Sequence, residues 1–236
     1  MDTFEDSLDP EEFGRLLRLG TEVSYRRGNQ LMRHGERGDC VMVLRSGQVR
    51  VVKPEGDGQS WKLLGVRGAG ELLGERAVLW FGERTATVEA RGPVLAVKVA
   101  RGVFQDFLRE HPRSREVCTR LLAIRTDRYE SRSLSGKPAD RVRQALIELA
   151  EPRGAWWEVP LTQVEIGMYV QVSKAVVQRT VRKLRGAGLV GKAGRGSLPV
   201  PCLPCLRKAQ KYGQGVRGCR GDRGCAVRLH GDSEYR

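Results

Sequence analysis

Two Glu-Arg pairs, Glu75-Arg76 and Glu83-Arg84, lie within the largely apolar stretch GERAVLWFGERTATV, residues 74–88. Charged side chains are seldom buried without a partner. Glu75 and Arg84 could therefore form a buried ion pair that braces a loop, or they could bind a small ligand that carries a phosphate. In the second case Gly74 lets the backbone approach the ligand and Glu75 accepts a hydrogen bond from a ribose hydroxyl. Arg84 and Thr85 would then hold the phosphate beside a short helix.

A second group of candidate residues lies in PLTQVEIGMYVQVSKAVVQRTVRKLRGAGLV, residues 160–190. Thr162, followed three residues later by Glu165, predicts a capping box, and Ser173 is expected to cap a second helix. The polar side of that second helix is nearly all hydrogen-bond donors. A short helix, a tight turn and a basic second helix are typical of a helix-turn-helix, although a solvated basic face on an ordinary helical hairpin is the alternative. The predicted DNA-binding residues are Thr162, Gln163, Ser173, Lys174, Gln178, Arg179, Arg182 and Lys183.

The distribution of charge supports two separate roles. The chain has 236 residues and a formal net charge of +14. Residues 1–110 contain 17 Lys and Arg and 17 Asp and Glu, whereas residues 111–236 contain 25 and 11. The second half is therefore expected to meet a polyanion. An acidic start, MDTFEDSLDPEEF, and the lack of a long apolar run predict a cytoplasmic protein.

The elements expected to position Glu75 and Arg84 are short strands. From Val23 to Val99, β-branched runs alternate with glycine-rich turns, which predicts an antiparallel sandwich or barrel. Asp9 and Pro10 predict the start of a preceding helix.

Helices follow the strands. In residues 113–134, Val117, Leu121 and Ile124 share one helical face, which fits either a dimer seam or a helix packed on its own domain. The segment SLSGKP ends this helix, so a hinge is expected at Ser133–Lys137, and Pro138 begins the next helix.

Three segments together resemble the cyclic AMP receptor protein/FNR (Crp/Fnr) family of bacterial transcription factors, over about residues 13–190. They are YRRGNQLMRHGERGDCVMVLRSGQVRVV, GERAVLWFGERTATV and LTQVEIGMYVQVSKAVVQRTVRKLRGAGLV. The resemblance implies an α+β fold with an N-terminal antiparallel β-roll (a cyclic nucleotide-binding jelly roll), a long dimerisation helix and a C-terminal winged helix-turn-helix. It also implies that Thr126 contacts the adenine of a nucleotide held by the Gly74–Thr85 segment.

The resemblance further implies a homodimer, joined through residues 113–134, that binds an inverted repeat in double-stranded DNA, with RNA polymerase as a further candidate partner. Cyclic AMP is the expected effector and cyclic GMP the alternative. No metal, catalytic residue or membrane association is expected. Two alternatives stay open: a regulator that needs no nucleotide, and a nucleotide-sensing module that acts on a protein partner. An enzyme is disfavoured because the three histidines, His34, His111 and His230, form no catalytic or metal-binding pattern.

Several residues depart from the family pattern. Arg76 stands where an apolar residue usually follows Gly-Glu, so it could add a phosphate donor or obstruct the pocket. Gln171 stands where the turn usually has glycine, at a cost of about 1 kcal/mol in the left-handed conformation. Lys174 and Ala175 replace an Arg and a Glu, so different operator bases are expected. The cysteine cluster of the iron–sulfur branch is absent from this sequence.

The segment after Val190 is rich in Gly, Pro and Arg and shows no alternating strand pattern, so it does not predict the family's two-stranded wing. The spacing of Cys202 and Cys205 suits a zinc site, but the wider spacing of Cys219 and Cys225 favours a disordered tail. The expected domains are a sensor domain at 1–111, a dimerisation helix and hinge at 112–137, a DNA-binding domain at 138–195 and a basic Gly/Arg-rich tail at 196–236.

Overall fold

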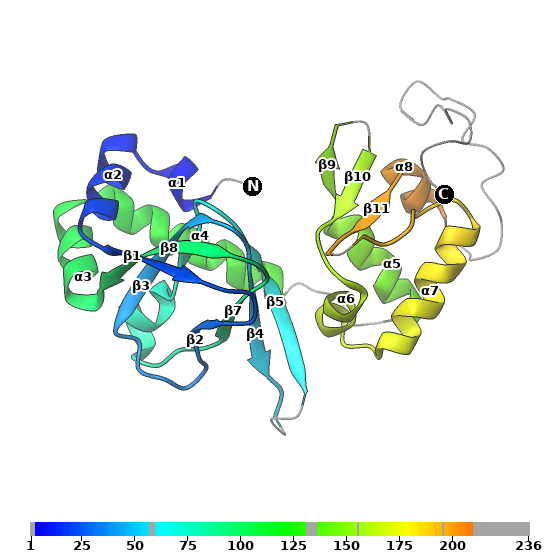
Figure 1. Ribbon diagram of the computed structural model, residues 1–236, viewed down its shortest axis with the longest axis horizontal. Coiled ribbons are helices and arrows are strands. Elements are labelled where there is room, and N and C mark those ends of the chain that lie inside the picture. Colours follow the sequence, from blue (N-terminus) through cyan, green and yellow to red (C-terminus); the bar gives the residue numbers. More distant parts are fainter. Residues whose placement is uncertain (1–2, 57–59, 131–135, 155, 195, 210–236) are drawn as a thin grey trace. The chain divides into compact units, whose positions relative to one another are not determined.

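The computed structural model describes residues 3–56, 60–130, 136–154, 156–194 and 196–209. The chain divides into two compact units, Met1–Arg132 and Ser133–Arg236, whose helices and strands are labelled in Figure 1. The second unit begins at the residue where the hinge is expected to begin. Residues 131–135 of that segment lie outside the described residues.

Two antiparallel sheets form the sandwich in the described part of the first unit. One has the strand order β1-β8-β3-β6 and the other the order β2-β7-β4-β5. The antiparallel sandwich predicted from the glycine-punctuated runs is therefore confirmed. The strands are β1 (Thr21–Tyr25), β2 (Gln30–Met32), β3 (Cys40–Ser46), β4 (Val49–Pro54), β5 (Trp61–Arg67), β6 (Leu72–Leu73), β7 (Thr87–Ala90) and β8 (Val94–Ala100).

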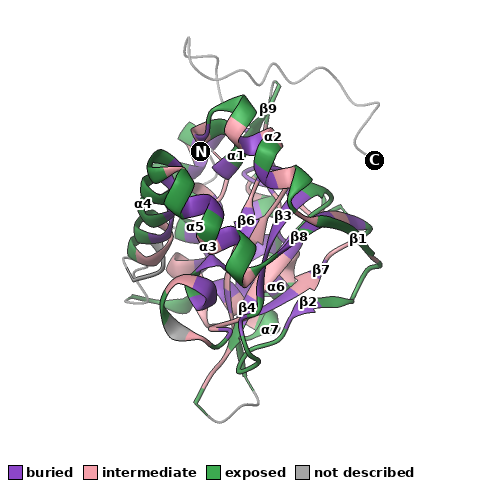
Figure 2. Cartoon of the chain, turned by 90° about the vertical axis from the view of Figure 1, so that its left-hand side faces the viewer, coloured by how far each residue is buried: buried purple, intermediate pink, exposed green. Residues whose placement is uncertain are grey.

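Strand β3 lies at the centre of this unit because both of its faces are covered. Side chains alternate along a strand, so Val41 and Val43 point to one face and Met42 and Leu44 to the other. The first pair belongs to a buried cluster that includes residues from the helices, and the second pair to a cluster shared with the other sheet. Figure 2 shows β3 and β8 as largely buried. This packing explains the unbroken apolar run CVMVL, since a strand covered on both faces needs no polar alternation.

The helix that Asp9 and Pro10 predict is present, and the described part of residues 113–134 is helical as far as Glu130. The Asp9 side chain accepts a hydrogen bond from the backbone N–H of Glu11 at 2.9 Å, which confirms it as a helix cap. The helices are α1 (Phe4–Ser7), α2 (Pro10–Arg18), the π-helix η1 (Ala77–Phe81), α3 (Arg101–Glu110) and α4 (Pro112–Glu130).

The apolar stripe predicted on α4 divides between two environments. Val117 and Leu121 belong to the buried core of the same unit. Ile124, in contrast, keeps 37% of its surface exposed. Packing on the helix's own domain therefore accounts for the first two positions, and only Ile124 faces outward.

The described part of the second unit contains four helices and a small sheet of strand order β11-β10-β9. Pro138 begins the first helix of this unit, as predicted. The elements are α5 (Pro138–Glu148), β9 (Glu151–Arg153), β10 (Trp156–Val159), α6 (Gln163–Val170), α7 (Lys174–Gly186), β11 (Leu198–Val200) and α8 (Leu203–Lys208).

The prediction that a disordered tail begins at residue 196 is wrong for residues 198–208. Leu198 and Val200 are fully buried, and β11 pairs antiparallel with β10 through Val159 opposite Leu198. Leu206 of α8 is also fully buried. Pro199 hides this strand in the sequence, but a proline is tolerated at the edge of a sheet, and β11 is an edge strand.

Residues 210–236 lie outside the described residues, and with them Cys219 and Cys225 of the candidate zinc set. Across the described ranges, none of the helices combines the length and the apolar character needed to cross a bilayer.

Candidate ligand pocket and nucleic-acid interface

Gly74 occupies a position that only glycine fits. Its φ is +80°, in the left-handed region that other residues rarely adopt. A Cβ atom at this position would lie 2.3 Å from Nη1 of Arg84 and 2.8 Å from Cε of Met32. The bare backbone therefore lets the Gly74 carbonyl accept a hydrogen bond from Arg84 Nη1 at 3.1 Å.

Arg84 is buried and fixes the segment to the start of β3. Its Nη2 donates to the backbone carbonyl of Cys40 at 2.8 Å and approaches the Asp39 carboxylate at 3.5 Å. A hydrogen bond from the Cys40 thiol is the main cause that lowers the pKa of the Asp39 carboxyl, with smaller contributions from Lys98 and Arg84. Arg84 is consequently part of the fold as well as part of the pocket wall.

Glu75 is paired with a residue that the sequence did not suggest. Its Oε1 accepts from Nη1 of Arg125, on α4, at 2.6 Å. The same guanidinium also donates to the Glu71 carboxylate and, at 3.0 Å, to the carbonyl of Leu72. The explanation of Glu75 and Arg84 as an ion pair is therefore wrong, because each has a different set of partners.

The electrostatics of this cluster follow from burial and from the two carboxylates. Burial lowers the pKa of the Arg125 guanidinium, but Glu75 and Glu71 outweigh that effect and raise the pKa above its ordinary value. Arg125 therefore remains charged, and its contacts join α4 to Glu71, Leu72 and Glu75.

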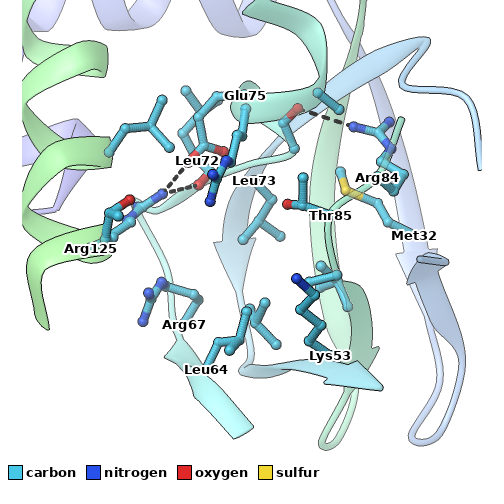
Figure 3. Close-up of a pocket in the computed structure, with 18 residues that line it drawn as sticks. Met32, Lys53, Leu64, Arg67, Leu72, Leu73, Glu75, Arg84, Thr85 and Arg125 are labelled. Carbon is cyan, nitrogen blue, oxygen red and sulfur yellow. Dashed lines mark hydrogen bonds and ion pairs between the residues drawn. The ribbon is translucent and has the colours of Figure 1, made fainter. Parts of the chain in front are cut away.

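A cavity of about 350 Å³ lies among these residues. All five residues predicted to bind the ligand line it: Gly74, Glu75, Arg84, Thr85 and Thr126. In Figure 3 the Gly74–Thr85 segment borders one end, Arg125 reaches in from α4, and Lys53, Leu64 and Arg67 of β4 and β5 border the other end. The volume is within the range of small-molecule sites, about 300–1,000 Å³.

Sequence reasoning missed three charged residues of this wall, namely Arg125, Lys53 and Arg67. The one available signal for Arg125 was that it directly precedes Thr126, which the sequence analysis does assign to the ligand site. Lys53 and Arg67 gave no such signal, since long polar side chains are ordinary on exposed strands. Arg76, noted in the sequence as a departure, also lines the pocket and is exposed.

In the second unit, α6 begins with the predicted capping box. The backbone N–H of Glu165 donates to Thr162 Oγ1 at 3.2 Å, and the N–H of Thr162 donates to Glu165 Oε2 at 2.8 Å. Thr162 and Gln163 are half-buried at this helix start. At the other end, the Tyr169 hydroxyl donates to Glu148 Oε1 of α5 at 2.9 Å, which holds α6 against its neighbour.

The turn between α6 and α7 is tight and left-handed. Gln171 has φ 54° and ψ 54°, and it is the one residue other than glycine with a positive φ among those that the structure describes. The next residue, Val172, donates its N–H to the Gly167 carbonyl at 3.0 Å. A Cβ on Gly167 would lie 2.9 Å from the Val172 carbonyl oxygen, so the turn favours glycine at position 167.

Helix α7 separates its buried and exposed sides as predicted. Val177, Val181 and Leu184 are buried. Ser173 occupies the N-cap position, but its side chain makes no capping hydrogen bond, contrary to the expectation that it caps the helix. The predicted DNA contacts on this helix and its cap are exposed to solvent, namely Ser173, Lys174, Gln178, Arg179, Arg182 and Lys183.

Two families of known domains match these two units. Residues 22–111 match the cyclic nucleotide-binding domain, which covers the sandwich and most of the pocket. Residues 140–208 match the Crp-like helix-turn-helix domain, which includes β11 and α8.

Individual relatives match most of the chain. The CRP-like cAMP-activated global transcriptional regulator of Mycobacterium tuberculosis is 24% identical over 81% of this chain and 89% of its own length. The cyclic AMP receptor protein of Thermus thermophilus is 29% identical over 82% of this chain and 89% of its own length. The solved structure of CLP from Xanthomonas campestris, described as a c-di-GMP responsive global regulator, has a TM-score of 0.69. It is 20% identical over 80% of this chain and 98% of that chain, and at this identity it shows the fold alone.

Proposed function

This chain belongs to the Crp/Fnr family of DNA-binding transcription regulators, with a cyclic nucleotide-binding domain, and we propose that it binds an inverted-repeat operator as a homodimer under the control of a nucleotide effector. The observation that carries the proposal is the exposed basic side of α7, which follows a capped α6 and a tight turn. Basic residues at the start of such a helix reach base edges, and those further along hold phosphates.

The homodimer is part of the proposal because an inverted repeat is read by two copies related by a twofold axis. Two recognition helices about 34 Å apart would contact successive turns of the duplex. Ile124 supports α4 as the contact between copies, since its side chain is 37% exposed in this single chain. RNA polymerase is a candidate partner of the DNA-bound dimer.

The effector is proposed to bind in the pocket of the first unit. The five residues predicted from the sequence line one cavity, and the relatives from M. tuberculosis and T. thermophilus are named for cyclic AMP. Cyclic AMP is therefore the first effector to test, and cyclic GMP the second. Thr126 and Thr85, both half-buried in the wall, are proposed to contact the base and the phosphate.

The test is selection of duplex DNA from a random pool by the full chain, followed by binding curves at several salt concentrations with and without cyclic AMP. Arg179→Ala should relax preference at one base pair in each half-site, at a cost of about 1–3 kcal/mol. Lys183→Ala, the matched control on the same exposed side, should weaken all sequences alike and lower the salt slope by about one unit.

The result also separates the proposal from its alternatives. Enrichment of inverted repeats only with nucleotide supports the proposal in full. Enrichment that is indifferent to nucleotide favours the nucleotide-independent regulator. If no duplex is enriched while nucleotide binds, the chain is better explained as a sensing module for a protein partner.

A further inference from the structure

Two cysteines lie three positions apart where β11 leads into α8. Cys202 occupies the N-cap position of α8, and Cys205 lies in the first turn of the same helix. The backbone N–H of Cys205 donates to the Cys202 sulfur at 3.4 Å, which holds that sulfur over the turn. The Cys205 thiol is also hydrogen-bonded to the Cys202 sulfur. The two sulfur atoms are therefore neighbours, and each of the two residues is a thiol rather than half of a disulfide.

The backbone around these cysteines has a spacing that a disulfide accepts. A disulfide joins residues whose Cα atoms are about 4.4–6.8 Å apart. The N–H of Leu206 donates to the Cys202 carbonyl at 3.1 Å, so Cys202 stands at helical spacing from this turn. Cα atoms three residues apart in an α-helix are separated by about 5 Å. Rotation of the two side chains is therefore enough to bring the sulfurs to bonding distance.

Access to solvent separates this pair from the other described cysteines. Cys205 is half-buried, whereas Cys40 and Cys118 are buried in the first unit. Burial is the main cause that raises the pKa of both the Cys40 and the Cys118 thiol. Burial, followed by the hydrogen bond to Cys202, also raises the pKa of the Cys205 thiol, to about 11. An oxidant can therefore reach Cys205, but the reaction is slow at neutral pH and needs an excess of the oxidant.

The helix that follows Cys202 is short and depends on packing. Helix α8 has six residues, and an isolated helix of that length is unstable in water. Leu203 and Leu206 are buried, and α8 packs against α5 (Figure 1). Arg143 Nη1 of α5 donates to the Leu206 carbonyl at 3.4 Å. A covalent bond across the first turn would thus hold α8 in the conformation in which it packs on the DNA-binding unit.

We propose that Cys202 and Cys205 are a redox-active dithiol, which a peroxide converts to a disulfide that holds the first turn of α8 in place. The thiolate of the more exposed Cys205 attacks a peroxide oxygen, the O–O bond breaks, hydroxide leaves and Cys205 becomes a sulfenic acid. The Cys202 thiolate then attacks the Cys205 sulfur, which forms the S–S bond and releases a second hydroxide. Two thiols and one hydrogen peroxide thus give one disulfide and two water molecules. The sulfurs lose two electrons, and the peroxide gains them.

The experiment treats the full chain carrying Cys219→Ser and Cys225→Ser with excess hydrogen peroxide, followed by peptide mass mapping without reduction. These two changes remove the cysteines that lie outside the described residues. The peptide that contains Cys202 and Cys205 should lose two hydrogen atoms, and dithiothreitol should restore them. Cys40 and Cys118 are internal controls, because they are buried and should remain thiols under the same conditions.

Single variants in the same background test the pairing. Cys202→Ser keeps a side chain that can cap α8, and Cys205→Ser leaves Cys202 unchanged. Neither variant can form the bond, so the remaining sulfur should gain oxygen instead of losing hydrogen. Phenylarsine oxide, which binds two neighbouring thiols at once, should add one arsenic to each reduced chain of the parent and none to either variant.

Hydrogen exchange tests whether the disulfide holds the helix. In the oxidised parent, the backbone amides of residues 203–208 should exchange at least about tenfold more slowly than in the reduced parent. The inference is wrong if the peptide with Cys202 and Cys205 gains oxygen without forming a disulfide, if either cysteine pairs with a second chain, or if the reduced parent binds no arsenic. A disulfide that leaves the exchange of α8 unchanged overturns the role of the bond in holding the helix.

Discussion

Two cations of the ligand pocket, Arg84 and Arg125, are largely enclosed and bonded to other parts of the first unit, whereas the cations of α7 are exposed. The Arg84 side chain is 5% exposed and contacts two backbone carbonyls, and the Arg125 side chain is 14% exposed and joins two carboxylates. Arg179 of α7, in contrast, lies in solvent beside other cations. Arg84 and Arg125 are thus part of the fold and of any ligand site together, while an α7 cation can serve a polyanion with little effect on folding.

The largest expected effect comes from Arg84→Leu. The change removes the donors to the Gly74 and Cys40 carbonyls and leaves those acceptors in a buried site. We expect the free energy of unfolding of the first unit to fall by about 3–5 kcal/mol, with loss of nucleotide binding. Urea unfolding of the full chain, with amide hydrogen exchange to report on each unit, measures this.

Arg179→Ala is the matched control for that measurement, because it also removes one arginine charge but from an exposed position. It should change stability by no more than about 0.5 kcal/mol. If Arg84→Leu has the same free energy of unfolding as the unmodified chain, yet binds no nucleotide, then Arg84 serves only the ligand. The contrast in stability between Arg84 and Arg179 would then be wrong.

A smaller loss is expected from Arg125→Met, which leaves the carboxylates of Glu71 and Glu75 close together without their cation. The three side chains keep some exposure, between 8% and 19%, so solvent offsets part of the loss. We expect the first unit to lose about 2–4 kcal/mol at neutral pH in urea unfolding.

Combining Arg125→Met with Glu71→Gln and Glu75→Gln should return much of the lost stability, since no uncompensated buried charge then remains. If the triple variant is as unstable as Arg125→Met alone, packing of the arginine side chain rather than its charge holds α4 in place.

The same contrast explains what could be predicted from the sequence. The capping box at Thr162 and the exposed donors of α7 depend on residues close together in the chain, so local pattern was sufficient. Gly74, Glu75, Arg84, Thr85 and Thr126 line one cavity, but Glu75 and Arg84 also bind the distant residues Arg125 and Cys40. Arg125 is separated from Glu75 by 50 positions, a pairing that no local pattern encodes.

The strand β11 was missed for a related reason. It has three residues with a proline in the middle, so its two buried positions were too few for a periodic pattern. Its place in the fold depends on pairing with β10, about 40 residues earlier in the sequence. Ser173 shows that a local pattern can also predict a contact that does not form. It occupies the N-cap position of α7, but its hydroxyl makes no capping hydrogen bond.

A smaller gain in stability is expected from a change in the turn that orients α7, where backbone conformation matters and charge does not. Gln171 has a left-handed conformation, which costs a side-chain-bearing residue more than glycine. Gln171→Gly removes that cost but adds freedom to the unfolded chain, so the second unit should gain only about 0.5–1 kcal/mol. Gly167→Ala is the matched change in the same turn, and it should lose about 1–3 kcal/mol because its Cβ would lie 2.9 Å from the Val172 carbonyl oxygen. Thermal unfolding of both variants measures the expected gain in stability for Gln171→Gly and the expected loss for Gly167→Ala.

With the charges of α7 unchanged, Gln171→Gly should also keep the salt dependence of DNA binding. A change in that slope would mean that the turn, and not the exposed cations alone, sets how many phosphates the helix reaches.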